Sequence, residues 1–476
     1  MDVRTDPPPA ALYPQPMNPA NYLLIHGVIV TQDASRTVLN DGAIAILGDR
    51  IVATGSTAGL LGEYRGQQTI DLGGDAVFPG LIDTHTHLFQ TATKGLGEDM
   101  PVHEWVGRVT APTAGHMRPE ETYLFAVTGC LEHIHCGVTT VVDMSYVAPV
   151  FELHEATIQG MLDSGLRGRY SSIIADYGEY HLPPEILKPI DQLLDEYTRL
   201  LRQYPANEHF GIWVAVGAPW VATDEAMIRA RAFTRETGTP MIMHLNENEV
   251  DNVLIQQRHG KNAIAWLEEI GFLGDDFLAI HCVRMTDDEI QVLAGYGVKV
   301  AYNPISNMYL GSGIAPMVKM AKAGMTVGLG VDGAGSNNSQ DMIETMKIAA
   351  LLQKVGAQDA SIIDAQTVLD WATLGGAQIL GMSDQIGSLE PGKKADLFVL
   401  SLNSPKIVPA HDPVATLVYS AGEENVTLTM ASGRILMKDR VIQHIDEADV
   451  LRRCQQAALA LADRCGSNRR LRRQWR

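Results

Sequence analysis

Hydrophobic and polar positions change their pattern twice along this chain, and the changes divide it into three parts. Residues 22–75 hold short apolar stretches separated by Gly and Asp, which is typical of a small antiparallel sheet. The stretches expected to form its strands are Leu23–Thr31, Ala43–Leu47, Arg50–Thr54 and Gln68–Asp71.

From about residue 77 to residue 375, short apolar runs alternate with longer amphipathic segments. Alternating strands and helices indicate parallel βαβ units. Eight such units predict a (β/α)8 TIM barrel, which is an α/β fold. The strand candidates are Val77–Ile82, Val138–Asp143, Gly168–Ile174, Gly211–Val216, Pro240–Leu245, Phe277–His281, Lys299–Tyr302 and Met325–Val331.

The last part of the chain returns to strands and turns. We expect Ala395–Leu400, Val426–Met430 and Arg434–Met437 to join the first segments in one small β-sandwich domain beside the barrel, and a helix over about Glu447–Arg464 to follow. The expected division is a disordered extension (1–20), a β-sandwich (21–75 and 386–442), a (β/α)8 barrel (76–385), and a helix with a basic tail (443–476).

The charge of the chain limits which partners it can bind, and its cysteine content indicates the cell compartment in which it works. With 56 acidic and 37 basic residues the net charge is −19, which argues against nucleic acid or an anionic membrane as a partner. The basic tail Arg469–Arg476 is interpreted as a solvated terminus. The five cysteines form no C-x-x-C pair, and the chain carries no signal peptide or membrane-spanning run, so we expect a cytoplasmic protein.

Candidate chemistry lies where the expected barrel strands end. His85 and His87 are two residues apart on a strand, so both rings point to the same side. His244 ends the fifth strand, His281 the sixth and Asp332 the eighth. Catalytic residues of such barrels gather at this end, and we expect these side chains to converge there.

A lone histidine at a strand end is usually structural, and His103 and His133 are interpreted as structural or surface residues. Metal-competent residues on several separate strands are much harder to explain by chance, and they predict a metal site. Imidazoles with one carboxylate suit Zn²⁺, or Fe²⁺, better than Mg²⁺ or Ca²⁺. The fourth strand, Ile212–Ala218, has no lysine to bridge two ions, which favours one divalent ion.

At this point the chain resembles the amidohydrolase superfamily, in particular its aminohydrolase and chlorohydrolase branch, over essentially its whole length. The matching stretches are Pro79–His87, His244–Glu247, Ala279–Val283, Gly330–Gly333 and Pro391–Leu397. The resemblance implies four metal ligands, His85, His87, His244 and Asp332. It also implies that His281 and Glu247 act next to the metal and contact the substrate.

These residues suggest a mechanism for hydrolytic deamination. The metal lowers the pKa of bound water, giving hydroxide near neutral pH. Asp332 can take the proton from this water and His281 can orient it. Hydroxide adds to a ring carbon bearing an amino group, and protonated Glu247 neutralises the adjacent ring nitrogen. Ammonia leaves, and the same machinery can expel chloride.

The stretches Asp99–Trp105 and Val331–Asn338 resemble the methylthioadenosine and S-adenosylhomocysteine deaminases. At two other places the chain differs from those enzymes. Those enzymes usually carry a histidine after the fourth strand, where this chain has Gly217–Val221. They also tend to carry a glutamate for the ribose hydroxyls, where this chain has Pro112–Ala114. Both departures argue against a nucleoside substrate.

Other stretches resemble melamine deaminase and atrazine chlorohydrolase, namely Met117–Glu120, Ser306–Gly313 and Gly381–Ser388. They favour a compact aminated heterocycle, which is triazine-, pterin-, pyrimidine- or purine-like. Adenosine-type deamination, dechlorination of a chlorotriazine and an inactive binding relative stay as alternatives. The expected substrate contacts are Glu247, Trp105, Trp220, Asn307 and Tyr309. Packing of rim loops between subunits in this family implies a homo-oligomer.

Overall fold

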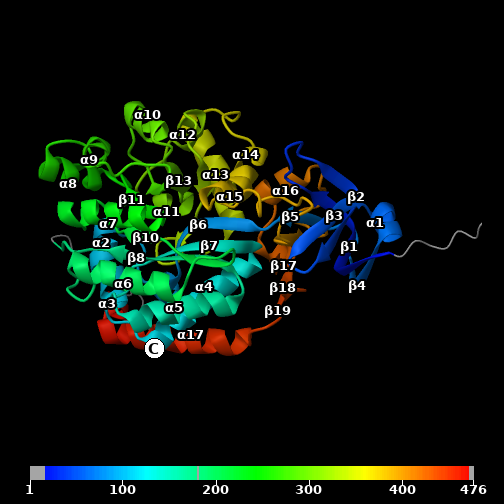
Figure 1. Cartoon of the computed structure of the whole chain (residues 1–476), viewed down its shortest axis with the longest axis horizontal. Helices are drawn as coiled ribbons and strands as arrows, with labels where there is room; N and C mark the ends of the chain where they lie inside the picture. The colour runs from blue at the N-terminus through cyan, green and yellow to red at the C-terminus, as the bar shows by residue number, and fades with distance from the viewer. Residues whose placement is uncertain (1–16, 179–181, 471–476) are drawn as a thin grey trace, which may run out of the picture.

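The computed structural model describes residues 17–178 and 182–470, which form a barrel with a smaller β domain at one end (Figure 1). Most of the expected N-terminal extension lies outside the described residues, but the first strand already begins at Asn18. Residues 471–476 of the basic tail also lie outside them.

A parallel sheet forms the wall of the barrel. Its strands within the described residues are β6 (Leu81–His87), β7 (Val138–Ser145), β8 (Arg167–Ile174), β9 (Phe210–Ile212), β10 (Val214–Val216), β11 (Met241–Leu245), β12 (Phe277–His281), β13 (Lys299–Tyr302), β14 (Val327–Leu329) and β15 (Asp332–Gly333). The strand order is β14-β13-β12-β11-β10-β8-β7-β6-β15, with β9 beside β8. At one end of this order β14 also contacts β6, next to the other end, and the hydroxyl of Thr84 on β6 donates to the carbonyl of Leu329 on β14 at 2.7 Å. The sheet therefore curls round on itself, and the predicted barrel is confirmed.

Helices surround this barrel (Figure 1). After the short α2 (Val102–Trp105) and α3 (Ala111–Gly115), they are α4 (Pro119–His135), α5 (Phe151–Ser164), α6 (Ile190–Gln203), α7 (Asp224–Thr237), α8 (Glu249–His259), α9 (Ala263–Glu269), α10 (Asp287–Gly295), α11 (Pro304–Tyr309), α12 (Met317–Lys322), α13 (Met342–Ala357), α14 (Ala365–Asp370) and α15 (Gly376–Ile379). The expected C-terminal helix is α17 (Glu447–Cys465), which runs along the outside of the barrel next to α4.

The β domain is a mixed sheet built from both ends of the chain. Its strands within the described residues are β1 (Asn18–Val30), β2 (Val38–Leu47), β3 (Arg50–Ser56), β4 (Tyr64–Asp71), β5 (Ala76–Pro79), β16 (Leu397–Leu400), β17 (Val426–Ala431), β18 (Arg434–Lys438) and β19 (Val441–Ile442), with helices α1 (Thr57–Glu63) and α16 (Pro413–Tyr419). Pairing of β5 with β16 confirms that the first and last segments join. The expected antiparallel arrangement of residues 22–75 is wrong in one place, because α1 carries the chain back so that β4 pairs with β1 in parallel.

The first expected barrel strand, Val77–Ile82, is in fact shared between the two domains and divided at Gly80. The N–H of Gly80 donates to the carbonyl of Asp396 in the β domain, and the N–H of the next residue donates to the carbonyl of Gly137 in the barrel. A Cβ on Gly80 would lie 2.2 Å from Oγ1 of Thr139, so only glycine fits at this crossing. The barrel strand therefore starts later and ends on His87.

A buried ion pair joins the two domains. Arg167 on β8 contacts Asp396 of the β domain and donates to Oγ of Ser432 at 2.9 Å, and both charged side chains are at most 2% exposed. We expect Arg167→Met to lower the free energy of unfolding by about 3–5 kcal/mol, because Asp396 is left buried without its partner. Urea unfolding measures this. The control Arg229→Met, at an exposed pair, should change little, and equal losses in both variants would contradict the prediction.

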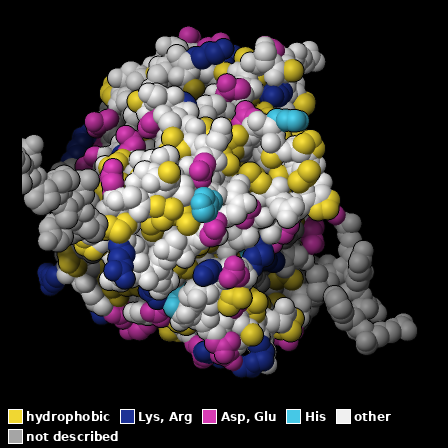
Figure 2. Space-filling view, turned by 90° about the vertical axis from the view of Figure 1, so that its right-hand side faces the viewer, with side chains coloured by type: hydrophobic (Ala, Val, Ile, Leu, Met, Phe, Trp, Pro, Cys, Tyr) yellow, Lys and Arg dark blue, Asp and Glu magenta, His cyan; other side chains and the backbone are white. Residues whose placement is uncertain are grey.

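The surface at the β-domain end mixes both signs of charge. Figure 2 shows acidic side chains interspersed with basic and apolar ones on this face. No helix in the described part of the chain combines the length and the apolar character needed to cross a bilayer. All five cysteines lie within the described residues and are free.

Candidate active site

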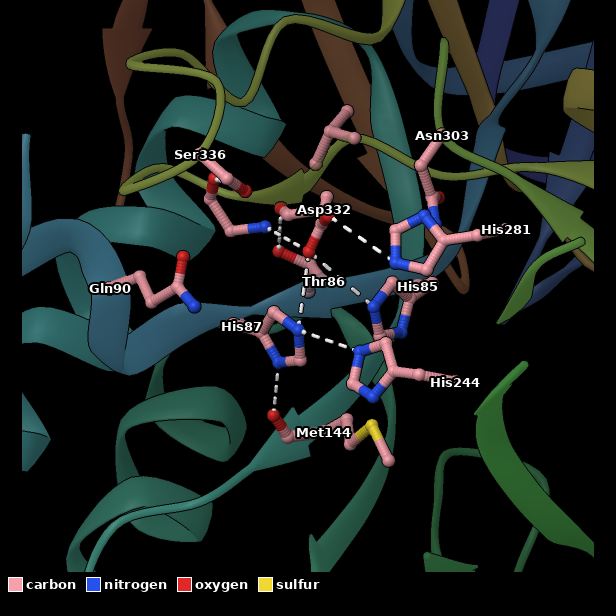
Figure 3. Close-up of polar contacts among 12 residues, drawn as sticks. His85, Thr86, His87, Gln90, Met144, His244, His281, Asn303, Asp332 and Ser336 are labelled. Carbon is pink, nitrogen blue, oxygen red and sulfur yellow. Dashed lines mark hydrogen bonds and ion pairs between the residues drawn. The ribbon is translucent and has the colours of Figure 1, made fainter. Parts of the chain in front are cut away.

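Three imidazoles and one carboxylate meet at the C-terminal ends of the barrel strands (Figure 3). Nε2 of His87 and of His85 lie 3.2 and 3.5 Å from Oδ1 of Asp332. Nε2 of His244 lies 3.3 Å from Nε2 of His87. Two overlapping groups here have ligand atoms within 4.8 Å of one another and can hold a metal ion: His85, His87 and Asp332, and His85, His244 and His281.

The second ring nitrogens show why this cluster suits a cation. Nδ1 of His87 contacts the carbonyl of Met144, and Nδ1 of His244 contacts the carbonyl of Gly217. A carbonyl only accepts, so each ring donates from Nδ1 and directs the lone pair of Nε2 at the centre. Two lone pairs and a carboxylate at this separation repel one another. A divalent ion between them removes that repulsion.

His85 gives an independent indication. Its side chain is fully buried, and neither ring nitrogen has a hydrogen-bond partner among the described residues. Buried polar atoms rarely lack a hydrogen-bond partner in a folded protein, so the two ring nitrogens of His85 indicate that a ligand binds here. The donor set of neutral nitrogens and one carboxylate oxygen therefore fits a divalent metal.

Burial sets the protonation state that metal binding requires. Burial first, and then the nearby His87 ring, lowers the pKa of His85 to about 3. Burial also holds the pKa of His244 well below its usual value. Burial alone would raise the pKa of Asp332, but contacts with His85 and His87 outweigh it and hold this pKa well below its usual range. The imidazoles of His85 and His244 are thus neutral and Asp332 is ionised, as ligands must be. Burial opposes the charged form of His87, but contacts with Asp332 raise the pKa of this ring, and a metal ion bound at its Nε2 would take the place of that proton.

A buried acid–base pair fixes the strands that carry these ligands. Oδ1 of Asp83 accepts the N–H groups of His85 at 3.1 Å and Val331 at 3.2 Å, which joins β6 to the eighth strand. Its Oδ2 lies 2.7 Å from Nε2 of His133, whose Nδ1 contacts the carbonyl of Gly129 on α4. His133 therefore has the structural role that the sequence suggests, and it positions the metal ligands indirectly.

Two side chains that can carry protons lie beside the cluster. Nε2 of His281 is 3.8 Å from both Oε2 of Glu247 and Oδ2 of Asp332. The hydroxyl of Ser312 donates to Oε1 of Glu247 at 3.0 Å. Burial raises the pKa of Glu247, which favours its protonated form. Nδ1 of His281 lies 2.9 Å from Oδ1 of Asn307, which holds the ring in place.

Backbone strain is concentrated at the same strand ends. His281 and Asp332 have φ values of 72° and 62°, in the left-handed region that non-glycine residues seldom adopt. Each such residue costs about 1–3 kcal/mol unless its surroundings fix it. Both residues belong to the cluster, so the strain coincides with the side chains that the site brings together.

An apolar pocket of about 660 Å³, open to solvent, lies over this cluster. Its floor includes His87, His244, His281, Glu247 and Asp332. Its walls are mostly apolar and aromatic, formed by Val102, Trp105, Val106, Tyr146, Ile173, Leu182, Ala218, Trp220, Val221 and Leu310. This lining suits a small, flat organic molecule.

The sequence pattern of the amidohydrolase family matches residues 76–436, which is more than half of the chain. The chain belongs to the amidohydrolase family. The match covers β5, the whole barrel and most of the C-terminal β segment, so the resemblance noted from the motifs is confirmed.

This amidohydrolase has relatives with named activities. It is 34% identical over 439 residues to a 5-methylthioadenosine/S-adenosylhomocysteine deaminase of Syntrophobacter fumaroxidans, covering 92% of this chain and 98% of that protein. An adenosine deaminase from Xanthomonas campestris, solved with bound zinc, has a TM-score of 0.88 and 28% identity over 94% of this chain and 100% of its own. A variant of the atrazine chlorohydrolase of Arthrobacter aurescens TC1, at TM-score 0.85 and 24% identity over 92% of this chain and all of its own, shares the fold.

The structure divides the expected substrate contacts of this amidohydrolase into two groups. Trp105, Trp220 and Glu247 line the pocket. Asn307 and Tyr309 do not, because Asn307 is fully buried behind His281 and the hydroxyl of Tyr309 accepts from Asn338 at 3.0 Å. Asn307 thus holds the ring of His281, while Tyr309 pairs with Asn338.

Sequence reasoning missed several pocket residues. Tyr146 follows β7, and Asn248 and Asp251 lie at the start of α8. Capping alone explains an Asn and an Asp at such positions, so nothing in the sequence marked them as pocket residues.

Proposed function

We propose that this amidohydrolase removes an amino group from a nitrogen heteroaromatic ring by hydrolysis, using one divalent ion, zinc, held by His85, His87, His244 and Asp332. The observation that carries the proposal is the convergence of imidazoles and an ionised carboxylate at the floor of an apolar-walled pocket, beside a carboxyl group whose pKa burial raises. When bound, the ion lowers the pKa of water and so supplies the nucleophile near neutral pH.

The chain's own residues then move the protons. Asp332 accepts a proton from the attacking water, and His281, between Asp332 and Glu247, holds that water by a hydrogen bond. Protonated Glu247 donates to the ring nitrogen next to the attacked carbon, which neutralises the charge formed there. The proton on Asp332 passes to the amino group, the C–N bond breaks and ammonia leaves. The hydroxyl on the attacked carbon gives its proton to the carboxylate of Glu247, which leaves a ring carbonyl and restores the protonated form of Glu247.

The relatives support a purine as the ring. The named activities of the relative from Syntrophobacter and of the Xanthomonas enzyme both concern adenosine derivatives. They strengthen the nucleoside alternative relative to the free heterocycle that the sequence favoured. Dechlorination has weaker support, because the likeness to the atrazine enzyme rests on the fold.

Metal removal tests the proposal. We expect about one zinc per chain by elemental analysis, loss of ammonia release after dialysis against a chelator, and recovery on adding zinc. The substrates to compare are adenosine derivatives, aminotriazines, pterins and aminopyrimidines, with chloride release followed in parallel for chlorotriazines. Full activity in metal-free protein would contradict the metal's role, and a zinc-loaded protein inert to the whole panel would favour a binding relative. The expected homo-oligomer stays a prediction that light scattering can check.

A further inference from the structure

Two polar side chains in the lining of the pocket have no part in the proposed mechanism. Asn248, the N-cap of α8, and Asp251, in its first turn, both line the pocket. Asp251 is 8% exposed. Among the described residues, neither Oδ1 of Asp251 nor Nδ2 of Asn248 has a hydrogen-bond partner, although both atoms are buried.

The other atoms of these side chains fix their orientation. Oδ2 of Asp251 accepts the N–H of Glu247 at 3.0 Å and that of Asn248 at 3.3 Å. Oδ1 of Asn248 accepts the N–H of Val250 at 2.8 Å. Helix capping thus uses one polar atom of each side chain and leaves the other available, an acceptor on Asp251 and a donor on Asn248.

His103 supports the carboxylate from behind. Its Nε2 lies 3.3 Å from Oδ1 of Asp251 but has no hydrogen-bond partner among the described residues, so the pair is close without meeting hydrogen-bond geometry. The His103 ring packs against Trp220, with 4.9 Å between ring centroids. His103 therefore connects α2, after the first barrel strand, to α8, after the fifth, and limits where Asp251 can move.

We propose that Asp251 and Asn248 form a recognition subsite for a hydroxylated substituent on the heteroaromatic substrate, with His103 as a positioning residue. A hydroxyl both donates and accepts, so it can satisfy Asp251 and Asn248 together. Leaving a buried acceptor unpaired costs free energy, which a substrate without the hydroxyl would not recover. The inference rests on the proposed deamination and specifies which ring substituent is recognised.

This subsite makes a nucleoside substrate compatible with the chain. The segment Pro112–Ala114 has no carboxylate for binding hydroxyl groups, and this lack is what counted against a nucleoside in the sequence. The pocket has such a carboxylate, but α8 provides it instead of the segment after α2. A substrate with hydroxyl groups is thus compatible with this chain.

The test compares two compounds with the same ring, adenosine and 2′,3′-dideoxyadenosine, in wild type and Asp251→Asn. Asparagine keeps an oxygen for the amides of Glu247 and Asn248, so α8 stays capped, but it turns an NH2 group to the pocket. We expect kcat/KM for adenosine to fall about 10–100-fold, mostly through KM, and that for the dideoxy compound to change less than about threefold. Glu249→Gln, exposed in the same turn, should affect neither compound.

The variant His103→Gln tests whether His103 positions Asp251 or only stabilises the fold. It should raise KM for adenosine more than for the dideoxy compound and leave kcat nearly unchanged. Equal losses on both compounds in Asp251→Asn, or a wild type that does not discriminate between them, would overturn the subsite.

Calorimetry distinguishes failure of the subsite from failure of the proposed function. If the zinc-loaded wild type releases no ammonia, binding of the two compounds is measured directly. Tighter binding of adenosine that Asp251→Asn abolishes would support the subsite while the deaminase proposal fails. Equal binding of both, or binding of neither, would overturn the subsite as well.

Discussion

Asp332→Asn is expected to lower kcat/KM for ammonia release by at least about 10³-fold. Asparagine cannot accept the proton of the attacking water, and it weakens the charge that faces the lone pairs of His85 and His87. Steady-state ammonia assays at saturating zinc measure the loss, and elemental analysis shows whether the ion is still bound.

Asp359→Asn is the matched control for this experiment, because Asp359 is exposed beyond the end of α13 and does not line the pocket. It should leave both activity and metal content unchanged. If Asp332→Asn kept its zinc and most of its activity, Asp332 would not be the proton acceptor.

Glu247→Gln is expected to lower kcat for ammonia release by about 10²–10⁴-fold while metal content stays the same. Glutamine has the same size and can keep the hydrogen bond from Ser312, but its amide is too weak an acid to protonate a ring nitrogen. Single-turnover kinetics measure the chemical step directly.

Glu249→Gln again serves as the control, since Glu249 lies two residues away, is exposed and does not line the pocket. The urea unfolding midpoints of both variants should match that of the wild type. A loss in Glu247→Gln of less than about threefold would show that some other group supplies the proton.

The barrel and the ligand set could be predicted from sequence because both depend on local patterns. Apolar runs end on His244, His281 and Asp332, and parallel strands bring such ends together. The break at Gly80 could not be predicted in this way. Its flanking residues form one apolar run, and only the close approach of Thr139 on another strand requires the glycine.

The role of a side chain at the site cannot be predicted from the sequence when a second, local role already explains the residue. Asp251 caps a helix, and that local role fully accounts for it in the sequence. Its second oxygen gains significance only because α8 begins beside the pocket and α2 brings His103 next to it. Asn307 presents the opposite case, since its motif suggested the substrate but tertiary packing places it behind His281.

The crossing at Gly80 has a consequence for engineering. One uninterrupted stretch of backbone serves as an inner strand of the β sheet and, one residue later, as the strand that ends on His87. The β domain therefore cannot be deleted or exchanged as a separate module, because any cut there frees the strand that carries two ligands. Variants with altered substrates are better sought in α2 and at the start of α8, where the pocket wall can change while that strand stays anchored.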